Sequence, residues 1–308
     1  MEKLLSFLSV SGIEHYENFD VSLLSSIKLG GYLKLAIMPK NKKELIKVLS
    51  FLTSKKFPYK VVGNLSNVLF VRDISYPVII TNKMVDEIEI KKNLVTVSAG
   101  MLISKFCDIL RKNGLSGIEG LIGIPATIGG AIVNNAGAFG QSISDKLVEI
   151  QAFARGKIVT LKRNEINFFY HGSNLNGFIV LSATFLFENK NEYDIICLSN
   201  EYSYRRNKSQ PSGLSLGSVY SKVNGKSAGF YIERAGLKGL RMGGIVISTK
   251  HANFFINDKG GSVIDFLRLS AIVESSALKQ FGLTLSPEIE KVGDEDEIVG
   301  RLSYTFKK

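Results

Sequence analysis

Cysteine and histidine are scarce in this chain of 308 residues. The two cysteines, Cys107 and Cys197, are too few for a disulfide framework or a structural zinc site. The three histidines lie far apart and lack the short spacings of metal ligands. The sequence therefore predicts no metal site, and a reducing, cytoplasmic location fits it best.

Long apolar runs and two familiar phosphate-binding motifs are also missing. No apolar run is long enough to span a bilayer, so we expect no membrane insertion. The apolar start from Leu4 to Ile13 is interpreted as an amphipathic helix and not as a signal peptide. No G-x-G-x-x-G follows a predicted strand, so the sequence lacks the fingerprint of a Rossmann dinucleotide-binding site. Gly225-Lys226-Ser227 resembles the end of a P-loop, but Tyr220 occupies the position of the required upstream glycine.

The chain carries a formal net charge of +11 without a concentrated basic segment. Lysine and arginine are spread along the sequence and form no recognised nucleic-acid-binding motif. We therefore expect no nucleic-acid partner. The positive charge could attract anionic small ligands, or it could reflect a lysine-rich composition without functional meaning; both explanations stay open.

Hydrophobic periodicity predicts an α+β fold without regular βαβ alternation. Helices are expected at 4–13, 41–55, 103–113, 192–206, 227–235 and 263–280. Strands are expected at 33–39, 59–63, 67–71, 178–187, 245–248 and 252–256, with hairpins around 91–93 and 155–156. A change of composition places a domain boundary just before Gln210.

A glycine-rich stretch from Gly117 to Gly140 stands out against this pattern. It holds seven glycines in an otherwise apolar run, GIEGLIGIPATIGGAIVNNAGAFG. Each glycine costs about 0.5–1 kcal/mol relative to alanine in a regular element, so the stretch predicts irregular backbone. Backbone amides of such a segment can reach a ligand such as a pyrophosphate. A tight buried turn without a ligand is the alternative.

Motifs spread over most of the chain resemble one family. Gly123–Gly140 is similar to the GIPGTVGGA…NAGAYG segment of the UDP-N-acetylenolpyruvoylglucosamine reductases, the MurB family. Further matches follow in the family's order at Ser25–Gly31, Gly63–Asn67, Gln210-Pro211 with Gly217–Tyr220, Ala228–Gly239 with Ser248–Asn257, and Leu285–Gly293. The short polar connection before Gln210 resembles the form of the family that lacks an inserted substrate-covering loop.

The resemblance implies a domain organisation. It implies an FAD-binding module of the PCMH/vanillyl-alcohol-oxidase type at 1–207, with subdomains at about 1–71 and 72–207. A C-terminal α+β domain at 208–308 would bind the UDP-sugar.

The resemblance also implies a reaction. NADPH would reduce bound FAD, and the flavin would pass hydride to UDP-N-acetylglucosamine enolpyruvate. The product would be UDP-N-acetylmuramate, a peptidoglycan precursor. Another flavin oxidoreductase of the same superfamily, or a homologue with reduced or lost catalysis, stays an alternative.

Two residues match catalytic positions of the family, and a third position differs. Ser218 matches the proton donor, and Glu288 matches the carboxylate that orients the substrate. The family's arginine is missing, because the segment reads Tyr170-His171-Gly172-Ser173. An imidazole that titrates near neutral pH is not equivalent to a permanently charged guanidinium. Either His171 takes over the role, or another basic group such as Arg205 or Arg206 substitutes for the arginine, or turnover is weak or absent.

The resemblance assigns the remaining site residues to FAD and to the substrate. The FAD-binding positions are Gly63, Asn64, Leu65, Ser66, Asn67, Gly123, Ile124, Pro125, Ala126, Thr127, Gly129, Gly130, Asn135, Gly137 and Ala138. The substrate-binding positions are Tyr170, Arg206, Lys222, Lys250, His251 and Asn253.

Some of these positions carry a further expectation. Asn64, Leu65 and Ala126 replace glycines of the family. If these positions contribute mainly amide N–H groups, side chains that point away are tolerable; if a position requires positive φ, Leu65 or Ala126 would be strained. For Lys250, His251 and Asn253 a buried polar cluster that braces the domain is the alternative.

Overall fold

The computed structural model describes residues 1–84 and 87–293, which fall into two compact units. Unit 1 comprises the described residues of 1–17, 35–64 and 76–206. Unit 2 comprises 18–34, 65–75 and the described residues from 207 onward. The division into domains at 1–207 and 208–308 stays a prediction, and the compact units group 18–34 and 65–75 with the C-terminal part.

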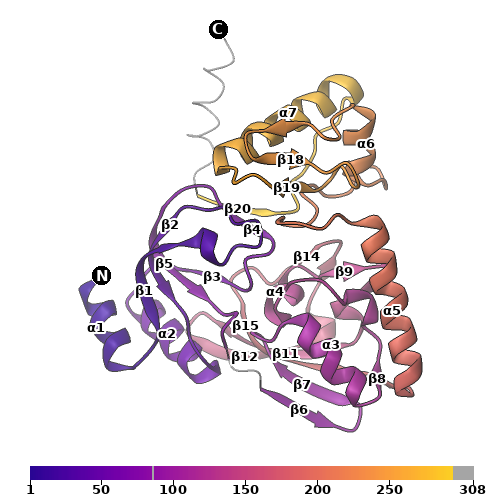
Figure 1. The fold of residues 1–308 in the computed structure, drawn as a ribbon. Helices are drawn as coiled ribbons and strands as arrows, with labels where there is room; N and C mark the ends of the chain where they lie inside the picture. Colours follow the sequence, from indigo (N-terminus) through magenta and orange to yellow (C-terminus); the bar gives the residue numbers. More distant parts are fainter. Residues whose placement is uncertain (85–86, 294–308) are drawn as a thin grey trace. The chain divides into compact units, whose positions relative to one another are not determined.

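A four-stranded sheet and two helices form the N-terminal part of the fold (Figure 1). Its strand order is β1 (His15–Asp20), β2 (Tyr32–Ile37), β5 (Ile74–Ile80) and β3 (Lys60–Val62). Helices α1 (Glu2–Val10) and α2 (Lys42–Ser54) bury their apolar faces in one core with Leu35, Ile37 and Ile79. Asn41 caps α2, since its Oδ1 accepts the amide of Glu44 at 2.9 Å.

A five-stranded antiparallel sheet forms the second core of unit 1. Its strand order is β12 (Lys157–Lys162), β11 (Leu147–Ala154), β15 (Ile179–Leu186), β7 (Leu94–Ser98) and β6 (Ile88–Lys91). Both predicted hairpins are confirmed by this sheet. Helices α3 (Ile103–Lys112) and α4 (Ile128–Val133) pack against it (Figure 1). Phe106 of α3 lies beside Phe185 and Phe187.

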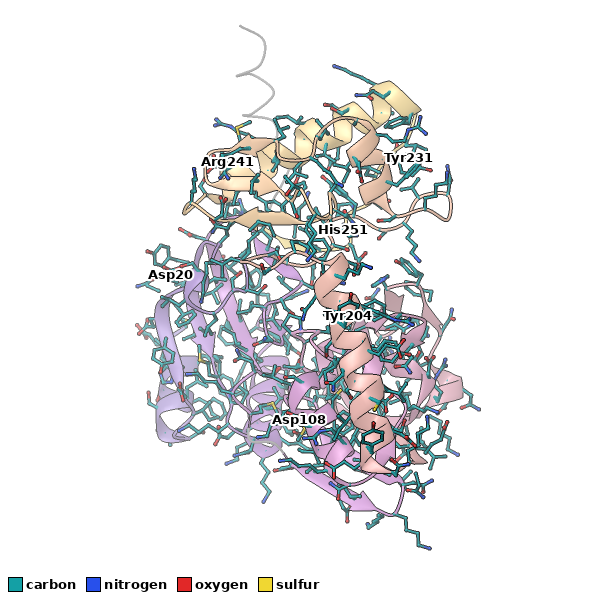
Figure 2. All side chains as sticks on the ribbon, turned by 45° about the vertical axis from the view of Figure 1, so that its right-hand side comes forward. Asp20, Asp108, Tyr204, Tyr231, Arg241 and His251 are labelled. Carbon is teal, nitrogen blue, oxygen red and sulfur yellow. The ribbon has the colours of Figure 1, made fainter. Side chains whose placement is uncertain are left out.

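Helix α5 (Glu192–Ser209) completes unit 1 and confirms the predicted helix through Arg206. Ile195 is its one fully buried residue, and Tyr204 on its outer side is 67% exposed (Figure 2). Short strand pairs of the unit are β8 (Leu115–Ser116) with β16 (Glu188–Asn189), β9 (Gly137–Ala138) with β10 (Gln141–Ser142), and β13 (Phe168–Phe169) with β14 (Gly172–Ser173). Single 3₁₀ turns lie at Glu119–Leu121, Ile143–Asp145 and Arg163–Glu165, and a further one at Val21–Leu23 belongs to unit 2.

Unit 2 has its own sheet and core. The sheet has the order β17 (Arg241–Met242), β18 (Ile245–Ile247) and β19 (Phe255–Asn257), and it packs with α6 (Ala228–Arg234) and α7 (Val263–Phe281). Strand β4 (Val68–Phe70) pairs in parallel with β20 (Glu290–Val292). Leu69 and Val71 thereby enter the core that holds Phe255 and Phe266.

One predicted strand of unit 2 was partly wrong. Strand β19 covers Phe255–Asn257 and not 252–256. The preceding residues form a turn instead, since the amide of Ser248 binds the Phe254 carbonyl at 2.9 Å and the amide of Phe254 binds the His251 carbonyl at 3.0 Å. The α+β class is confirmed, and no helix among the described residues is both long and apolar enough to cross a bilayer.

Candidate functional site

The glycine-rich stretch is more regular than expected. It contains a 3₁₀ turn at Glu119–Leu121 and the short helix α4. The expectation of irregular backbone throughout was therefore wrong for 128–133. Thr127 caps α4 by accepting the amide of Gly130 at 3.3 Å, which lets two consecutive glycines stand in a helix.

Several of its glycines are required by close approach of other segments. A Cβ on Gly63 would overlap Thr127 Oγ1, and a Cβ on Gly129 would lie 3.0 Å from the Cβ of Ala99. Gly123 has a φ of +83° and faces the Arg206 side chain. The glycines thus bring Gly63, the 123–130 segment and the residue after strand β7 together within unit 1, as a tight buried turn would also require.

Loop 63–67 presents backbone donors. Within the described part of the chain, the amides of residues 64–67 donate no hydrogen bond. Leu65 has a φ of +54°, and a left-handed residue in a turn aligns neighbouring N–H groups around an anion. These features fit the pyrophosphate of FAD.

The structure decides both expected strain points, Leu65 and Ala126. Leu65 is in the left-handed region and is strained, but its side chain is 2% exposed and packs in the interior. Ala126 is not among the residues with positive φ. Asn64 uses its side chain instead, because its Nδ2 donates to the Pro125 carbonyl at 2.8 Å.

Arg206 supports the glycine-rich stretch from helix α5. Its Nε donates to the Ile122 carbonyl at 2.9 Å and its Nη2 to the Gly120 carbonyl at 3.2 Å. The guanidinium also lies 5.3 Å from the ring centre of Phe139. Burial lowers the pKa of Arg206. Gln141, which the sequence did not point to, accepts the Gly120 amide at 2.7 Å.

Tyr170 and His171 form the tip of the β13–β14 hairpin. His171 has a φ of +53°, which histidine tolerates better than most residues, and its ring packs edge-on against Tyr170 at 4.1 Å. Tyr170 is 53% exposed. Asn135 Nδ2 donates to the Phe169 carbonyl at 3.0 Å, and Ser173 Oγ donates to the Val133 carbonyl at 2.7 Å. The hairpin is therefore tied to the glycine-rich stretch at both of its strands.

Ser218 and Glu288 meet through backbone contacts in unit 2. Ser218 forms an isolated bridge with Phe254. On the following residue, the Val219 carbonyl accepts the Glu288 amide at 2.8 Å. Gly217, directly before Ser218, has a φ of +78°. The structure thus brings together two of the three predicted catalytic residues.

Glu288 has an unusual acidity for a carboxyl group. Burial raises the pKa of Glu288 to about 7, and the charge of Lys222 opposes part of that rise. A carboxyl group with this pKa is available in both protonation states near neutral pH. Such a shift is frequent among groups that act in proton transfer.

Asn253 and its neighbours brace this segment. The Asn253 side chain is buried, accepts the Tyr220 amide at 3.0 Å and donates to the Tyr220 carbonyl at 2.7 Å. His251 Nδ1 accepts the Asn253 amide at 3.2 Å, and burial lowers the pKa of His251. Lys250 Nζ donates to the Asn207 carbonyl. For Asn253 the geometry favours the bracing role that the sequence left open.

Comparisons with known proteins show the family of this chain. The family described as FAD binding domain matches residues 33–162, and the one described as UDP-N-acetylenolpyruvoylglucosamine reductase, C-terminal domain, matches 210–292. A UDP-N-acetylenolpyruvoylglucosamine reductase of Caldicellulosiruptor bescii is 36% identical over 94% of both chains. The chain belongs to this reductase family. A reductase of Pediococcus pentosaceus is 33% identical over 94% of this chain and 97% of its own. The crystal structure of the reductase from Thermus caldophilus superposes with a TM-score of 0.78 at 29% identity, covering 91% of this chain and 99% of the other.

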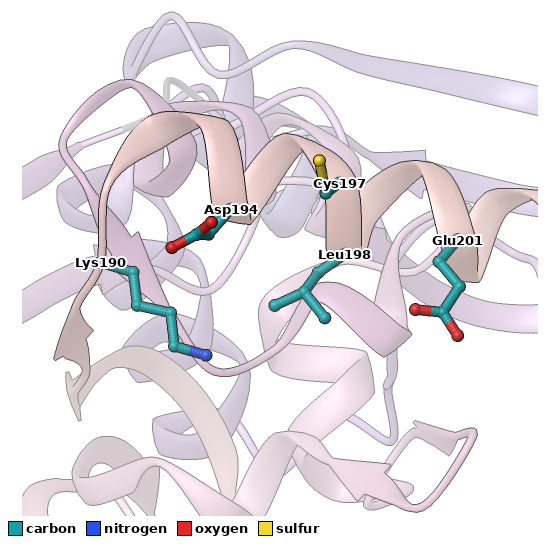
Figure 3. A pocket seen from close by; sticks show the side chains of 5 residues that line it. All are labelled: Lys190, Asp194, Cys197, Leu198 and Glu201. Atoms are coloured by element: carbon teal, nitrogen blue, oxygen red, sulfur yellow. The ribbon is translucent and has the colours of Figure 1, made fainter.

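A hollow on helix α5 lies apart from the residues that the reductase family points to. It has a volume of 360 Å³ and is lined by Lys190, Asp194, Cys197, Leu198 and Glu201 (Figure 3). None of the predicted site residues lines it, and its charges are mixed. In the described parts of the chain, no three His, Cys, Asp or Glu side chains are grouped so that they could hold a metal ion.

Proposed function

We propose that this chain reduces UDP-N-acetylglucosamine enolpyruvate to UDP-N-acetylmuramate, with FAD as bound cofactor and NADPH as reductant. The observation that carries the proposal is the backbone bond from the Glu288 amide to the Val219 carbonyl, which brings Glu288 to the residue after Ser218 in a member of the reductase family. We propose the cytoplasm as the compartment and keep the division at 207/208 as the boundary between FAD-binding and UDP-sugar parts.

FAD would be held mainly by backbone groups. The amides of residues 64–67 would bind its pyrophosphate, and the segment 123–130 with Asn135, Gly137 and Ala138 would contact the rest of the cofactor. Bound FAD supplies the hydride, which it receives from NADPH. Arg206 binds the carbonyls of Gly120 and Ile122 and so supports the segment that precedes residues 123–130.

Ser218 would deliver the proton. Hydride addition leaves negative charge on the carbon next to the substrate carboxylate, and a hydroxyl at Ser218 can quench it on one face. Glu288, with a pKa of about 7, can donate a hydrogen bond to the developing enolate when protonated. Lys222, Lys250 and the ring of Tyr170 would contact the UDP-sugar.

His171 would take the position of the family's arginine. As a neutral ring it can donate one hydrogen bond, and when protonated it adds a charge. A second candidate function follows from the same residue: a flavin-binding homologue that has lost the second half-reaction. The two candidates differ in whether reduced enzyme turns over the enolpyruvyl substrate.

The test separates the half-reactions. The purified chain is reduced anaerobically with NADPH and mixed with UDP-N-acetylglucosamine enolpyruvate, while flavin absorbance and product are followed. We expect reoxidation with formation of UDP-N-acetylmuramate. Ser218→Ala should slow this step by about 10²–10⁴-fold and leave reduction by NADPH unchanged. A flavin that is reduced but ignores the substrate would favour the second candidate.

His171→Arg distinguishes an adapted site from a handicapped one. A large gain in reoxidation rate would mean that the histidine limits turnover. A loss would mean that the site is built around His171, and the left-handed backbone there, which histidine tolerates better, is a physical reason to expect it.

A further inference from the structure

Asn82 is linked through Asn64 to the two segments of unit 1 that are proposed to bind FAD, residues 63–67 and 123–130. It lies just after strand β5, in a turn. Asn82 Nδ2 donates to Asn64 Oδ1 at 3.3 Å, and Asn64 Nδ2 donates to the Pro125 carbonyl at 2.8 Å. Asn64 and Pro125 both belong to segments for which we propose contact with FAD.

The direction of this relay is fixed by the proline carbonyl. A carbonyl can only accept, so Asn64 must turn its NH₂ group to Pro125 and its oxygen to Asn82. Asn82 must then offer its own NH₂ group to that oxygen. The amide oxygen of Asn82 is consequently the one group of this chain of hydrogen bonds that is left to accept a further bond. Reversing either side-chain amide would place two oxygens or two NH₂ groups against each other.

This end of the relay has no partner among the described residues. Asn82 Oδ1 is buried from solvent and accepts no hydrogen bond there. Leaving a buried acceptor unsatisfied costs about 1–3 kcal/mol, and folded proteins rarely do so without a reason. A ligand that brings a hydrogen-bond donor to this place would remove that cost.

We propose that Asn82 is a further FAD-binding residue, whose Oδ1 accepts a hydrogen bond from a donor of the cofactor. The inference rests on the proposed function. The pyrophosphate has no donor at neutral pH, so the donor belongs to the flavin half, as an imide N–H or ribityl hydroxyl, or to the adenosine half, as an amine or ribose hydroxyl. Asn64 orients Asn82 and, through Pro125, links it to the second cofactor loop.

The test compares Asn82→Leu with Asn64→Ala. Both variants break the bond between the two asparagines, but only the first removes the acceptor. Apoprotein is titrated with FAD, and binding is followed by flavin fluorescence. We expect Asn82→Leu to bind FAD about tenfold more weakly than wild type, the equivalent of one hydrogen bond. Asn64→Ala removes the residue that orients the acceptor but keeps the acceptor itself, so its loss should be clearly smaller.

Equal losses in the two variants would overturn the inference, because Asn82 would then only brace Asn64. A wild-type chain that does not bind FAD would overturn the proposed function as well, so the two failures are distinguishable. Titrations with FMN and ADP show which half carries the donor: a tenfold loss for FMN alone assigns the flavin half, and a loss for ADP alone assigns the adenosine half.

Two controls keep the comparison meaningful. Asn93→Leu removes a side-chain bond of the same kind, from Nδ2 to the Phe187 carbonyl at 3.1 Å, in the turn between β6 and β7. It should leave FAD affinity unchanged. Urea unfolding of each apoprotein verifies that it is folded, and Asn82→Ala replaces Asn82→Leu if the larger side chain prevents folding.

Discussion

At the scale of single residues, Glu288 is the group whose environment departs most usefully from that of a surface carboxyl. Burial destabilises its charged form more than Lys222 stabilises it, so the pKa of Glu288 rises to about 7. Its backbone amide is bound to the residue after Ser218. The segment that carries Glu288 is therefore bound to the segment that carries the predicted proton donor.

The raised pKa of Glu288 has a consequence for stability. The folded state binds this proton more tightly than the unfolded state, so the contribution is fully present below about pH 4.5 and is lost as the pH rises to about 7. Between pH 5 and 8 we expect wild type to lose on the order of 2 kcal/mol of unfolding free energy relative to Glu288→Gln, after allowance for partial solvent screening. Urea unfolding at both pH values measures this. Parallel pH profiles of the two proteins would contradict it.

At the scale of elements, the Ser218–Tyr220 segment depends on residues far away in the sequence. Asn253 binds both backbone groups of Tyr220, and the Tyr220 hydroxyl donates to Glu274 Oε1 at 3.1 Å on helix α7. The segment is thus fixed on one side by the turn before β19 and on the other by residues 286–288. Such support would hold the hydroxyl of Ser218, the predicted proton donor, at one position.

Removing the Asn253 side chain should loosen this segment. Asn253→Ala leaves the amide and the carbonyl of Tyr220 without partners, which we expect to lower the unfolding free energy by about 2–4 kcal/mol. Urea unfolding followed by circular dichroism is the measurement, since the chain has no tryptophan. Asn113→Ala removes an exposed bond to the Ile109 carbonyl and should change the free energy by less than about 0.5 kcal/mol. Similar losses in the two variants would refute the bracing role of Asn253.

The turn before Ser218 offers a second test at this scale. Gly217 and Gly236 both have positive φ and open space where a Cβ would stand, so alanine introduces backbone strain without a clash. We expect Gly217→Ala and Gly236→Ala each to cost about 1–2 kcal/mol of unfolding free energy. Only Gly217→Ala should also slow reoxidation of the reduced enzyme by substrate, because it shifts Ser218. Equal turnover in both variants would show that the turn does not position the serine.

At the scale of the whole molecule, cofactor binding should appear as stability. A ligand that binds only the folded chain stabilises it by mass action, by about 2.7 kcal/mol at 100 times its Kd and about 4.1 kcal/mol at 1,000 times. We expect FAD to raise the unfolding free energy along this curve. Urea titrations at several FAD concentrations measure it, and adenosine should have a smaller effect because it lacks the pyrophosphate and the flavin. Independence from FAD concentration would contradict the proposed cofactor site.

Local patterns revealed most elements but few of the contacts that build the site. The spacing of Leu45, Val48, Leu49 and Leu52 was sufficient for α2, because a helix depends on near neighbours. The glycine content concealed α4, whose stability comes from the Thr127 cap and from packing. Nothing at Asn82 itself indicates its bond to Asn64, and the bonds from Arg206 span 84 and 86 residues. Contacts between residues so far apart in the sequence are set by the fold, and no periodic pattern in the sequence indicates them.

The interleaving of the two units bears on how the chain matures during synthesis. The core of unit 2 includes Ile27, Leu29, Leu69 and Val71, and strand β4 has β20 as its parallel neighbour. These N-terminal residues leave the ribosome long before Phe255, Phe266 and Ile289 exist. Until translation reaches them, the early apolar segments have no native core to enter and are available to chaperones or to wrong partners. Truncation within β20 should therefore impair the packing of segments such as β4 that were synthesised first.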